Sequence, residues 1–470
     1  MGASERKRKQ NSVTVLTYKP MDTRFAVVSI VATLLATVGL VKFGAAPIAV
    51  LCVLLWLAVF FHHHPLLLML LWPATLIHQQ IFFGKSLSEV SSAFANLPIL
   101  FYPMDVPYFF TIAYLIIKFA TRRREVIRAL RENPFLSVLM VIVLASLIVF
   151  TPLYGKSAIG EARKSFFCFL FPLLTALTIK TYRDIRILML GVLITAVCLS
   201  LLGYSNVMFG RPIAVSGEGA LVLLLTTFSI LVMHANGMVM TTKVIDVALI
   251  GLFLLQLVIT QQRSVALAGI AGLVLLFGLQ RHKIPFLAKA IVTTTALLIV
   301  ISLVFINTPE FERSFTKRMS GIIKPESDHT GSWRMRGWRQ QLNDLSAREL
   351  LVGKGLGSYY LWFDRGAKNI VGPHNTYVMI VLKLGLLGLV IYGLLVFRFF
   401  HKILGVANNL PRGPMRAYLE MSVVNFGAAH AYMMGYDFCL IILMFYAIGT
   451  SAARLLEDFR EVSEQRKEAA

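Results

Sequence analysis

Residues 374–397 read HNTYVMIVLKLGLLGLVIYGLLVF, an apolar run that follows the polar, glycine-broken segment 353–373. A run of about 20 apolar residues can cross a bilayer as an α-helix, whose backbone polar groups are all satisfied within the helix. His374 opens this run, so an ionisable imidazole stands where a water-side loop enters the membrane. Such a position is costly for a residue without a function, and it suits chemistry on a lipid-anchored substrate.

Similar runs recur along the 470 residues, of which 57% are hydrophobic and 15% charged, with a mean hydropathy of +0.71. This composition excludes an ordinary soluble protein and predicts an all-α polytopic membrane protein. The stretches on either side of 62–65 could form two spans, one bent element or a re-entrant hairpin, so we expect twelve to fourteen spans. The predicted spans lie near residues 25–42, 46–61, 65–78, 106–120, 135–152, 165–180, 186–204, 219–236, 243–260, 264–280, 285–306, 374–397, 417–434 and 437–453.

The net charge of +22 has a topological explanation. No basic tract alternates with aromatic residues on a soluble segment, so we expect no nucleic-acid binding. If the N-terminus is cytoplasmic, the two tails and the inner loops hold 27 of the 46 basic residues. This matches the preference of cytoplasmic loops for lysine and arginine. The long segment 307–373 then lies outside, on the periplasmic side.

These assignments divide the chain into five parts. Within the outer segment, Trp338, Leu342 and Leu345 recur with the period of an amphipathic helix between Trp333 and Leu351. We expect this helix to lie on the bilayer surface or to cap the cavity between the spans. The parts are a basic cytoplasmic tail at 1–24, an N-terminal transmembrane bundle at 25–306, a large ordered periplasmic loop at 307–373, C-terminal transmembrane helices at 374–453 and a cytoplasmic tail at 454–470.

Several basic residues fall at the outer face, where the charge preference of loops does not explain them. Arg163, Arg211 and Arg263 flank predicted spans at this face, as His374 does. A guanidinium is always charged and can fork onto two phosphate oxygens, so these arginines indicate phosphate binding. The alternative is an arginine whose stem lies in the membrane while its head reaches the lipid headgroups.

The cysteines and the histidine triplet 62–64 do not indicate a metal site. The triplet is typical of a polar turn on the cytoplasmic side. Four cysteines lie in apolar runs without paired spacing, which indicates small core residues rather than disulfides or metal ligands. They are Cys52, Cys168, Cys198 and Cys439.

Several short motifs together resemble the O-antigen ligase family, which also takes in related polysaccharide polymerases. The resemblance covers residues 255–395, and its motifs occur in the family's order. They are TQQRS at 260–264, an Arg-x-x-x-Trp pattern at 334–338, GKGLG at 353–357, His374-Asn375 at a helix start and KLGLLG at 383–388, with Arg163 matching an arginine before a middle span.

The signature breaks at Lys383, where many members of the family carry an acidic residue. A role that depends on that carboxylate therefore does not transfer to this chain. Glu420, His430 and Asp437 of the last two predicted spans could pair with one another or with Lys383. A buried pair between Lys383 and an acidic residue would account for the change.

The resemblance implies a GT-C-like transferase at the periplasmic face of a bacterial inner membrane. Its donor would be a glycan on undecaprenyl diphosphate and its acceptor a hydroxyl group. Arg163 and Arg263 would clamp the diphosphate, and Arg334 and Arg211 would make further substrate contacts. No Asp-x-Asp pair of metal-dependent glycosyltransferases occurs, so we expect an inverting reaction without metal or cofactor.

His374 would take the acceptor proton, because an imidazole titrates near neutral pH. Asn375 would orient His374 or a neighbouring loop, and the glycines upstream would let the backbone approach a ligand closely. The alternative for His374 is a residue that merely caps the helix.

Three functions remain possible at this stage. A ligase would deliver the glycan to a lipid A–core sugar, and a polymerase would deliver it to another lipid-linked glycan. A transporter of lipid-linked glycans would do no chemistry. It would be expected to carry internal repeats and broken, paired helices, and the sequence indicates neither. We expect the ligase.

Overall fold

The computed structural model describes residues 56–82, 105–208, 215–260, 262–280, 329–358, 360–364, 367–370, 373–436 and 440–468. The chain divides into two compact units, 1–63 and 64–470, and only the helical residues 56–63 of the first are described. The predicted spans 25–42 and 285–306 lie outside the described residues, as does most of 46–61.

Six helices of the described residues are long and apolar enough to cross a membrane. A seventh is reached if the apolar helices on either side of His64 count as one broken span, an arrangement that the sequence left open. The prediction of an all-α polytopic membrane protein is therefore confirmed. The six are α7 (Pro134–Tyr154), α10 (Tyr182–Met208), α11 (Gly217–Ala235), α12 (Lys243–Thr260), α18 (Thr376–Asn408) and α20 (Leu440–Glu468).

Further helices complete the bundle. Two of them, 167–178 and Arg263–Leu279, are apolar but shorter than a full span. Each coincides with a predicted span, at 165–180 and 264–280. The remaining elements are α4 (Pro65–Phe82), α6 (Asp105–Glu132), α8 (Lys156–Ser165), η1 (Phe167–Phe169), α9 (Leu170–Thr178), α13 (Arg263–Leu279) and α19 (Pro414–Met433).

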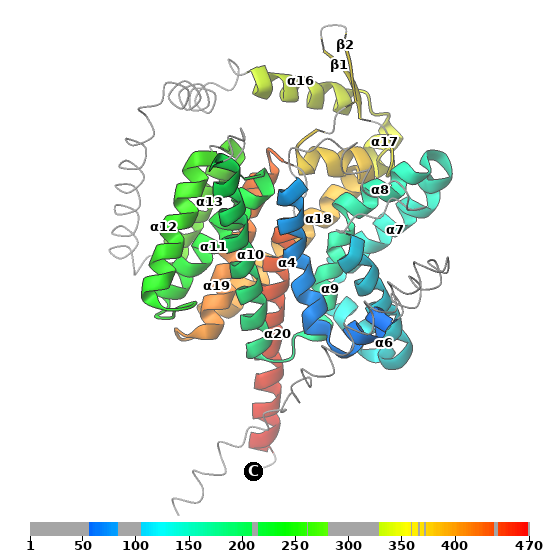
Figure 1. The fold of residues 1–470 in the computed structure, drawn as a ribbon. Helices are drawn as coiled ribbons and strands as arrows, with labels where there is room; N and C mark the ends of the chain where they lie inside the picture. The colour runs from blue at the N-terminus through cyan, green and yellow to red at the C-terminus, as the bar shows by residue number, and fades with distance from the viewer. Residues whose placement is uncertain are drawn as a thin grey trace, which may run out of the picture. The chain divides into compact units, whose positions relative to one another are not determined.

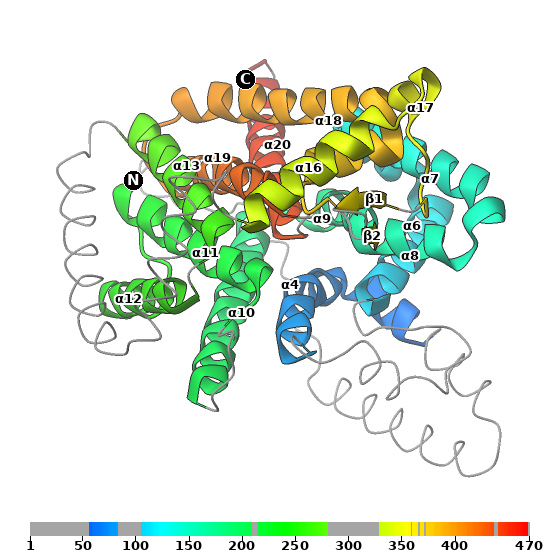
Figure 2. The ribbon, with the colours of Figure 1, turned by 90° about the horizontal axis from the view of Figure 1, so that it is seen from above.

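Helix α11 lies at the centre of the bundle. In the most apolar 18-residue stretch of α11, 83% of the residues are buried. The corresponding stretches of α7 and α12, which face outward, are only 22% buried. It packs against α10, α12, α13 and α19, as Figures 1 and 2 show. Its position explains why its sequence is apolar on every side rather than amphipathic.

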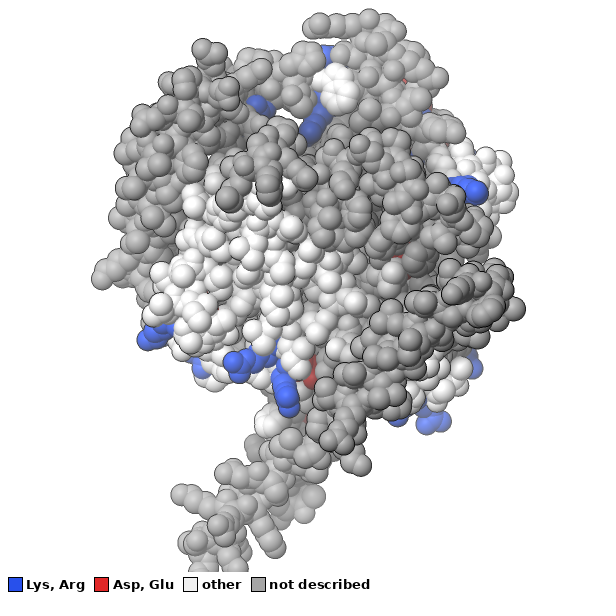
Figure 3. Space-filling model, in the orientation of Figure 1, with Lys and Arg blue, Asp and Glu red and all other residues white. Residues whose placement is uncertain are grey.

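The outward faces of α10 and α12 are apolar, as a lipid-facing surface requires. Ile194 and Leu201 of α10 and Val244 and Val247 of α12 are all exposed. Figure 3 shows this uncharged surface, with lysine and arginine side chains along its lower edge. Large exposed apolar areas are rare on soluble monomers, so the surface supports a membrane-embedded chain.

Helix α18 is broken within its apolar run, which the sequence did not predict. Gly385 has a φ of 70° and a ψ of −174°, so a short helix from Thr376 ends there and a longer one continues to Asn408. Leu382, near the break, has a carbonyl that accepts a hydrogen bond of 2.8 Å from the Lys354 backbone N–H. The Lys354 N–H thus satisfies a backbone carbonyl next to the break, as the apolar interior of a membrane requires.

The outer segment holds two helices and a hairpin where the sequence predicted one amphipathic helix from Trp333 to Leu351. Helix α16 (His329–Asn343) ends early, and α17 (Ala347–Val352) restarts after Ser346. Ser346 and Glu349 form a capping box there, and the Ser346 hydrogen bonds lower the pKa of Glu349. Strands β1 (Leu361–Asp364) and β2 (Ala367–Ile370) then pair antiparallel.

This segment covers one end of the bundle, and α20 extends from the other end (Figure 1). Helix α16 packs against α18 and β1, and α17 packs against α18. These contacts hold the segment against α18, and its expected position at the bilayer surface or over a cavity stays a prediction.

Candidate functional site

His374 lies directly before helix α18 in a strained backbone conformation. Its φ of 47° is the only positive value of a non-glycine residue among the described residues. Such a conformation costs about 1–3 kcal/mol and is found most often at functional sites. The imidazole is half-buried, and its ring centre lies 6.3 Å from that of Tyr436.

Asn375 fixes the start of α18. Its side-chain oxygen accepts hydrogen bonds from the backbone N–H groups of Tyr377 and Val378, at 3.0 and 3.1 Å. Its amide nitrogen donates to the Met434 carbonyl at 2.9 Å, in the loop between α19 and α20. Asn375 therefore acts as an N-cap and ties the His374 backbone to that loop. Its expected part in substrate binding remains a prediction.

Helix α16 covers His374 from the outer side. Arg334 donates from Nη1 to the Gly435 carbonyl at 3.1 Å, while its Nε is buried without a hydrogen-bond partner among the described atoms. One turn later, the Trp338 indole donates to the Pro373 carbonyl, directly before His374. The Arg-x-x-x-Trp motif thus binds both the segment directly before His374 and the loop between α19 and α20.

Arg263 is the first residue of α13, and this helix start lies beside the same loop. A Cβ built on Gly435 would lie 3.5 Å from the Ser264 Cβ. The start of α11 is also close, because a Cβ at Gly217 would lie 2.6 Å from the Tyr432 hydroxyl and 2.8 Å from the side-chain amide oxygen of Gln262.

Helices α11, α13 and α18 therefore all begin around the loop 432–436. Asn375 caps α18 and Ser216 caps α11, whereas α13 has no side-chain cap. The unpaired N–H groups at such a helix N-terminus carry partial positive charge and favour a phosphate group. Arg334 and Arg263 add formal positive charge at the same end of the bundle. The described residues at this end include the acidic Glu218, in the first turn of α11.

Arg163 lies on α8, where it forms an ion pair with Asp105 at 2.9 Å. Both side chains remain partly accessible, at 26% and 12%. The structure gives no direct contact between Arg163 and His374, and Arg211 lies outside the described residues.

Lys383 has an acidic partner that sequence reasoning missed. Its ammonium lies 2.9 Å from a carboxylate oxygen of Glu161 on α8, and the lysine is only 1% exposed. It also contacts the Ser358 hydroxyl at 3.0 Å and lies 3.9 Å from the centre of the Tyr360 ring. The same carboxylate accepts hydrogen bonds from the Tyr360 hydroxyl at 2.5 Å and the Gly357 N–H at 2.6 Å.

The expectation that Lys383 pairs with Glu420, His430 or Asp437 is therefore wrong for the described residues. Glu420 instead binds Arg416 at 2.8 Å, and His430 contacts the Tyr392 hydroxyl at 3.0 Å. Asp437 lies outside the described residues. Glu161 could have been suspected, because it is the only acidic residue between Glu132 and Asp184 and falls at a predicted outer face.

The glycines of GKGLG lie against other parts of the protein, and the expectation that they let the backbone approach a ligand stays a prediction. A Cβ on Gly353 would lie 2.3 Å from the Lys383 carbonyl, and one on Gly355 would lie 2.3 Å from the Phe150 ring. Gly357 has backbone atoms of Ala158 at 2.6 Å. All three glycines have positive φ angles, which residues with a side chain adopt at a cost. They join the outer segment to α7, α8 and the break of α18.

No group of three or more histidine, cysteine or acidic side chains positioned to hold a metal ion occurs in the part of the chain that the structure describes. The functional groups at the outer end are instead an imidazole, guanidinium groups and helix N-termini. Such groups can bind an anion and accept a proton.

Comparison with known proteins gives an independent result. A family model described as O-antigen ligase matches residues 248–393. No curated protein matches the chain. The matched residues contain Arg263, Arg334, His374 and Asn375, and they extend through the break of α18. They leave out α8, which carries Arg163 and Glu161. Residues 248–393 of this multi-pass membrane protein therefore match the O-antigen ligase family model.

Proposed function

We propose that the protein is a glycosyltransferase of the bacterial inner membrane that moves a glycan from undecaprenyl diphosphate to a hydroxyl acceptor at the periplasmic face. The observation that carries this proposal is the position of His374. It lies in a strained conformation against Tyr436, next to the loop in which the Gly435 carbonyl accepts from Arg334 and Gly435 lies beside the start of α13. A proton acceptor and an anion-binding surface thus occupy one end of the bundle, within the segment that matches the family.

The reaction needs one proton transfer and one displacement. An imidazole nitrogen of His374 takes the proton of the acceptor hydroxyl, and the acceptor oxygen attacks the anomeric carbon of the glycan. The bond from that carbon to the diphosphate oxygen breaks, and its electron pair leaves with the diphosphate. A single displacement of this kind inverts the configuration at the anomeric carbon.

The leaving diphosphate gains one negative charge, which the protein must stabilise. Arg263 and Arg334 are suited to this because a guanidinium stays charged and donates several hydrogen bonds. The N–H groups at the start of α13 add further donors. We infer that these groups supply the charge that a divalent metal supplies in other glycosyltransferases, so that no added metal is required.

Arg163 would join this site by exchanging partners. Asp105 holds its guanidinium now, and both side chains are partly accessible to a ligand. A diphosphate could take the place of the carboxylate because it offers the same planar pairs of oxygens with more charge. Arg211 would make a further substrate contact, a role proposed from sequence alone.

The break of α18 reopens the transporter alternative, because broken helices near a binding site are typical of transporters. In this chain the break is closed by Lys354 and by the pair of Lys383 and Glu161, so the chain itself fills the gap. The match to the ligase family favours chemistry. Between the two enzymes, we propose that the acceptor is a lipid A–core sugar rather than a second lipid-linked glycan.

A transfer assay with the purified protein tests these points. With a lipid-linked glycan donor and a lipid A–core acceptor, His374→Ala should lose activity at least about 100-fold, the contribution of a general base. His401→Ala is the matched control, since His401 is exposed on the distant half of the same helix. Wild-type activity should persist in EDTA, and Arg263→Ala should raise the donor concentration needed for half-maximal rate.

Full activity of His374→Ala in EDTA would contradict the assignment of the general base. Elongation of the donor in the absence of the core acceptor would identify a polymerase instead. Donor transport by vesicles without any glycan transfer would favour the transporter.

A further inference from the structure

A cavity of about 440 Å³ lies between α10, the end of α11 and the start of α19, at the end of the bundle opposite His374. Its volume falls in the range of small-molecule sites, roughly 300–1,000 Å³. Tyr182 and Arg186 of α10 and Tyr418 of α19 stand among its lining residues. Nothing in the proposed transfer reaction uses this cavity.

The interior of the cavity is apolar and adaptable. Methionine has three rotatable bonds and a polarisable sulfur, so methionine-lined pockets accommodate flexible apolar chains of varied shape. The lining contains five methionines, Met189, Met233, Met238, Met240 and Met421. Such a surface fits an acyl chain better than a sugar or a nucleotide, which would need several polar partners.

Polar groups gather at one side of the cavity. Arg186 is the only charged residue of its lining, it is exposed, and no acidic side chain within 4.0 Å pairs with it among the described residues. The Tyr182 hydroxyl is buried beside Tyr418, and the two rings lie 5.2 Å apart. Arginine with tyrosine is the pairing found where helices pass the lipid headgroups.

The acidic residues closest in sequence already have partners. Asp184 accepts hydrogen bonds from the Lys180 and Thr181 N–H groups at 2.9 and 2.8 Å. Glu420 pairs with Arg416 at 2.8 Å. The positive charge of Arg186 is therefore available to an anionic ligand.

We propose that this cavity binds an anionic phospholipid, with an acyl chain among the methionines and the phosphate against Arg186 and the Tyr182 hydroxyl. Basic pockets between transmembrane helices are suited to such headgroups. In the proposed orientation the lipid comes from the cytoplasmic leaflet, but the site itself does not depend on the transferase reaction.

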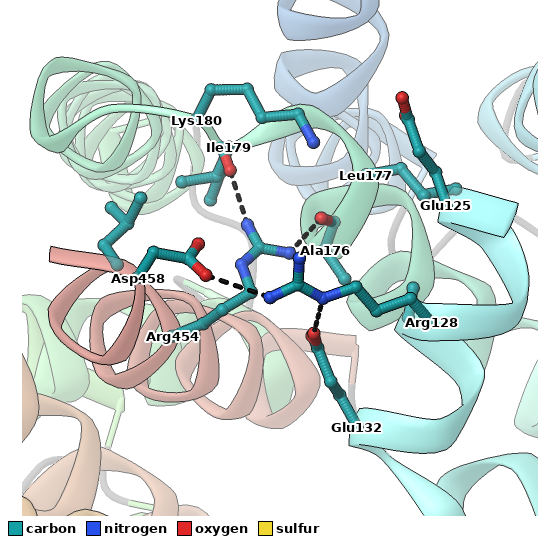
Figure 4. A pocket seen from close by; sticks show the side chains of 11 residues that line it. Glu125, Arg128, Glu132, Ala176, Leu177, Ile179, Lys180, Arg454 and Asp458 are labelled. Atoms are coloured by element: carbon teal, nitrogen blue, oxygen red, sulfur yellow. Dashed lines mark hydrogen bonds and ion pairs between the residues drawn. The ribbon is translucent and has the colours of Figure 1, made fainter. Parts of the chain in front are cut away.

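A second cavity at this end provides a contrast. It measures about 250 Å³, and its arginines are already engaged, as Figure 4 shows. Arg128 binds Glu132 at 2.8 Å and Asp458 at 2.9 Å, and Arg454 donates to the carbonyls of Ala176 and Ile179. Both arginines therefore already have protein partners. These contacts hold the helices together and leave neither guanidinium available for a lipid phosphate.

The proposal is tested on the full-length protein in detergent by native mass spectrometry. Phosphatidylglycerol and phosphatidylcholine with identical acyl chains serve as probes, and inorganic phosphate serves as a competitor. Phosphatidylglycerol should bind more tightly, and Arg186→Gln should weaken its binding at least about tenfold, as expected for loss of a charged hydrogen bond. Arg183→Gln is the matched control, because Arg183 is exposed on the same turn but does not line the cavity.

A cavity-filling variant tests the acyl-chain part separately. Met238→Trp keeps Arg186 but occupies the half-buried loop side of the cavity, so it should also lower phosphatidylglycerol binding. Equal binding of the two lipids, or an equal effect of Arg183→Gln, would overturn the proposal. Displacement of the lipid by millimolar inorganic phosphate would show a simple anion site and would overturn the lipid assignment.

Discussion

At the scale of single residues, the pair of Lys383 and Glu161 explains how a charged residue occupies an apolar helix. A buried charge is tolerated only when it is paired and its remaining hydrogen bonds are made. The lysine meets the carboxylate, the Ser358 hydroxyl and the Tyr360 ring, while the carboxylate also accepts from Gly357. The pair therefore fastens the outer segment to α8 and to the half of α18 that follows His374.

Removing one member of this pair should be worse than removing both. Lys383→Met or Glu161→Gln leaves the partner buried without its counterpart, which should lower the free energy of unfolding by about 3–5 kcal/mol. The double variant should recover a large part of that loss. Unfolding in mixed detergent micelles measures all three. Additive losses in the double variant would contradict a coupled pair.

At the scale of elements, the break at Gly385 depends on two glycines, Gly385 and Gly353, each of which lies against the backbone of the other's segment. A Cβ on Gly385 would lie 2.2 Å from the Leu351 carbonyl oxygen, and one on Gly353 would lie 2.3 Å from the Lys383 carbonyl. The backbones of α17 and α18 thus touch where the helix is interrupted, and Lys354 donates to the Leu382 carbonyl there. The short helix that starts after His374 is held at its far end by these contacts.

Alanine at either glycine should displace this short helix. With a positive φ and backbone atoms inside contact distance, Gly385→Ala should cost at least about 2 kcal/mol of stability. Gly393→Ala is the matched control in the same helix, since no atom lies within 4 Å of a Cβ there. The control should be neutral or stabilising by about 0.5–1 kcal/mol. Melting temperatures in detergent distinguish the two, and equal melting temperatures would contradict the close contact.

The elements differ in how far the sequence could predict them. Apolar length predicted the six described helices that are long enough to cross a membrane, because each run must bury its backbone polar groups in its own helix. The break of α18 was missed, since Gly385 lies in a run that stays apolar on both sides. The partner of Lys383 was missed because an ion pair between α8 and α18 leaves no periodic pattern in the chain. The structure brings Asn375 and Arg334 to the loop 434–436 beside His374, and their expected roles in binding stay predictions.

At the scale of the whole molecule, the charge distribution argues for one orientation in the membrane. The segments assigned to the cytoplasm hold 27 of the 46 basic residues, and Figure 3 shows lysine and arginine along the lower edge of the apolar surface. The segment from α16 to β2 lies at the other end, at the top of Figure 1, and Trp338 of α16 binds the Pro373 carbonyl directly before His374. Positive loops favour the cytoplasmic side, so His374 should face the periplasm.

Cysteine labelling tests this orientation. In a background without Cys52, Cys168, Cys198 and Cys439, single cysteines are placed at three exposed sites, by Ala347→Cys at the start of α17, Thr242→Cys before α12 and Asn409→Cys after α18. A membrane-impermeant maleimide should label the first in intact spheroplasts and the other two only after lysis, because these loops lie at opposite ends of the bundle. Labelling of all three after lysis controls for accessibility. The reverse pattern would place His374 on the cytoplasmic side, where no periplasmic acceptor could reach it, and the proposed reaction would fail with it.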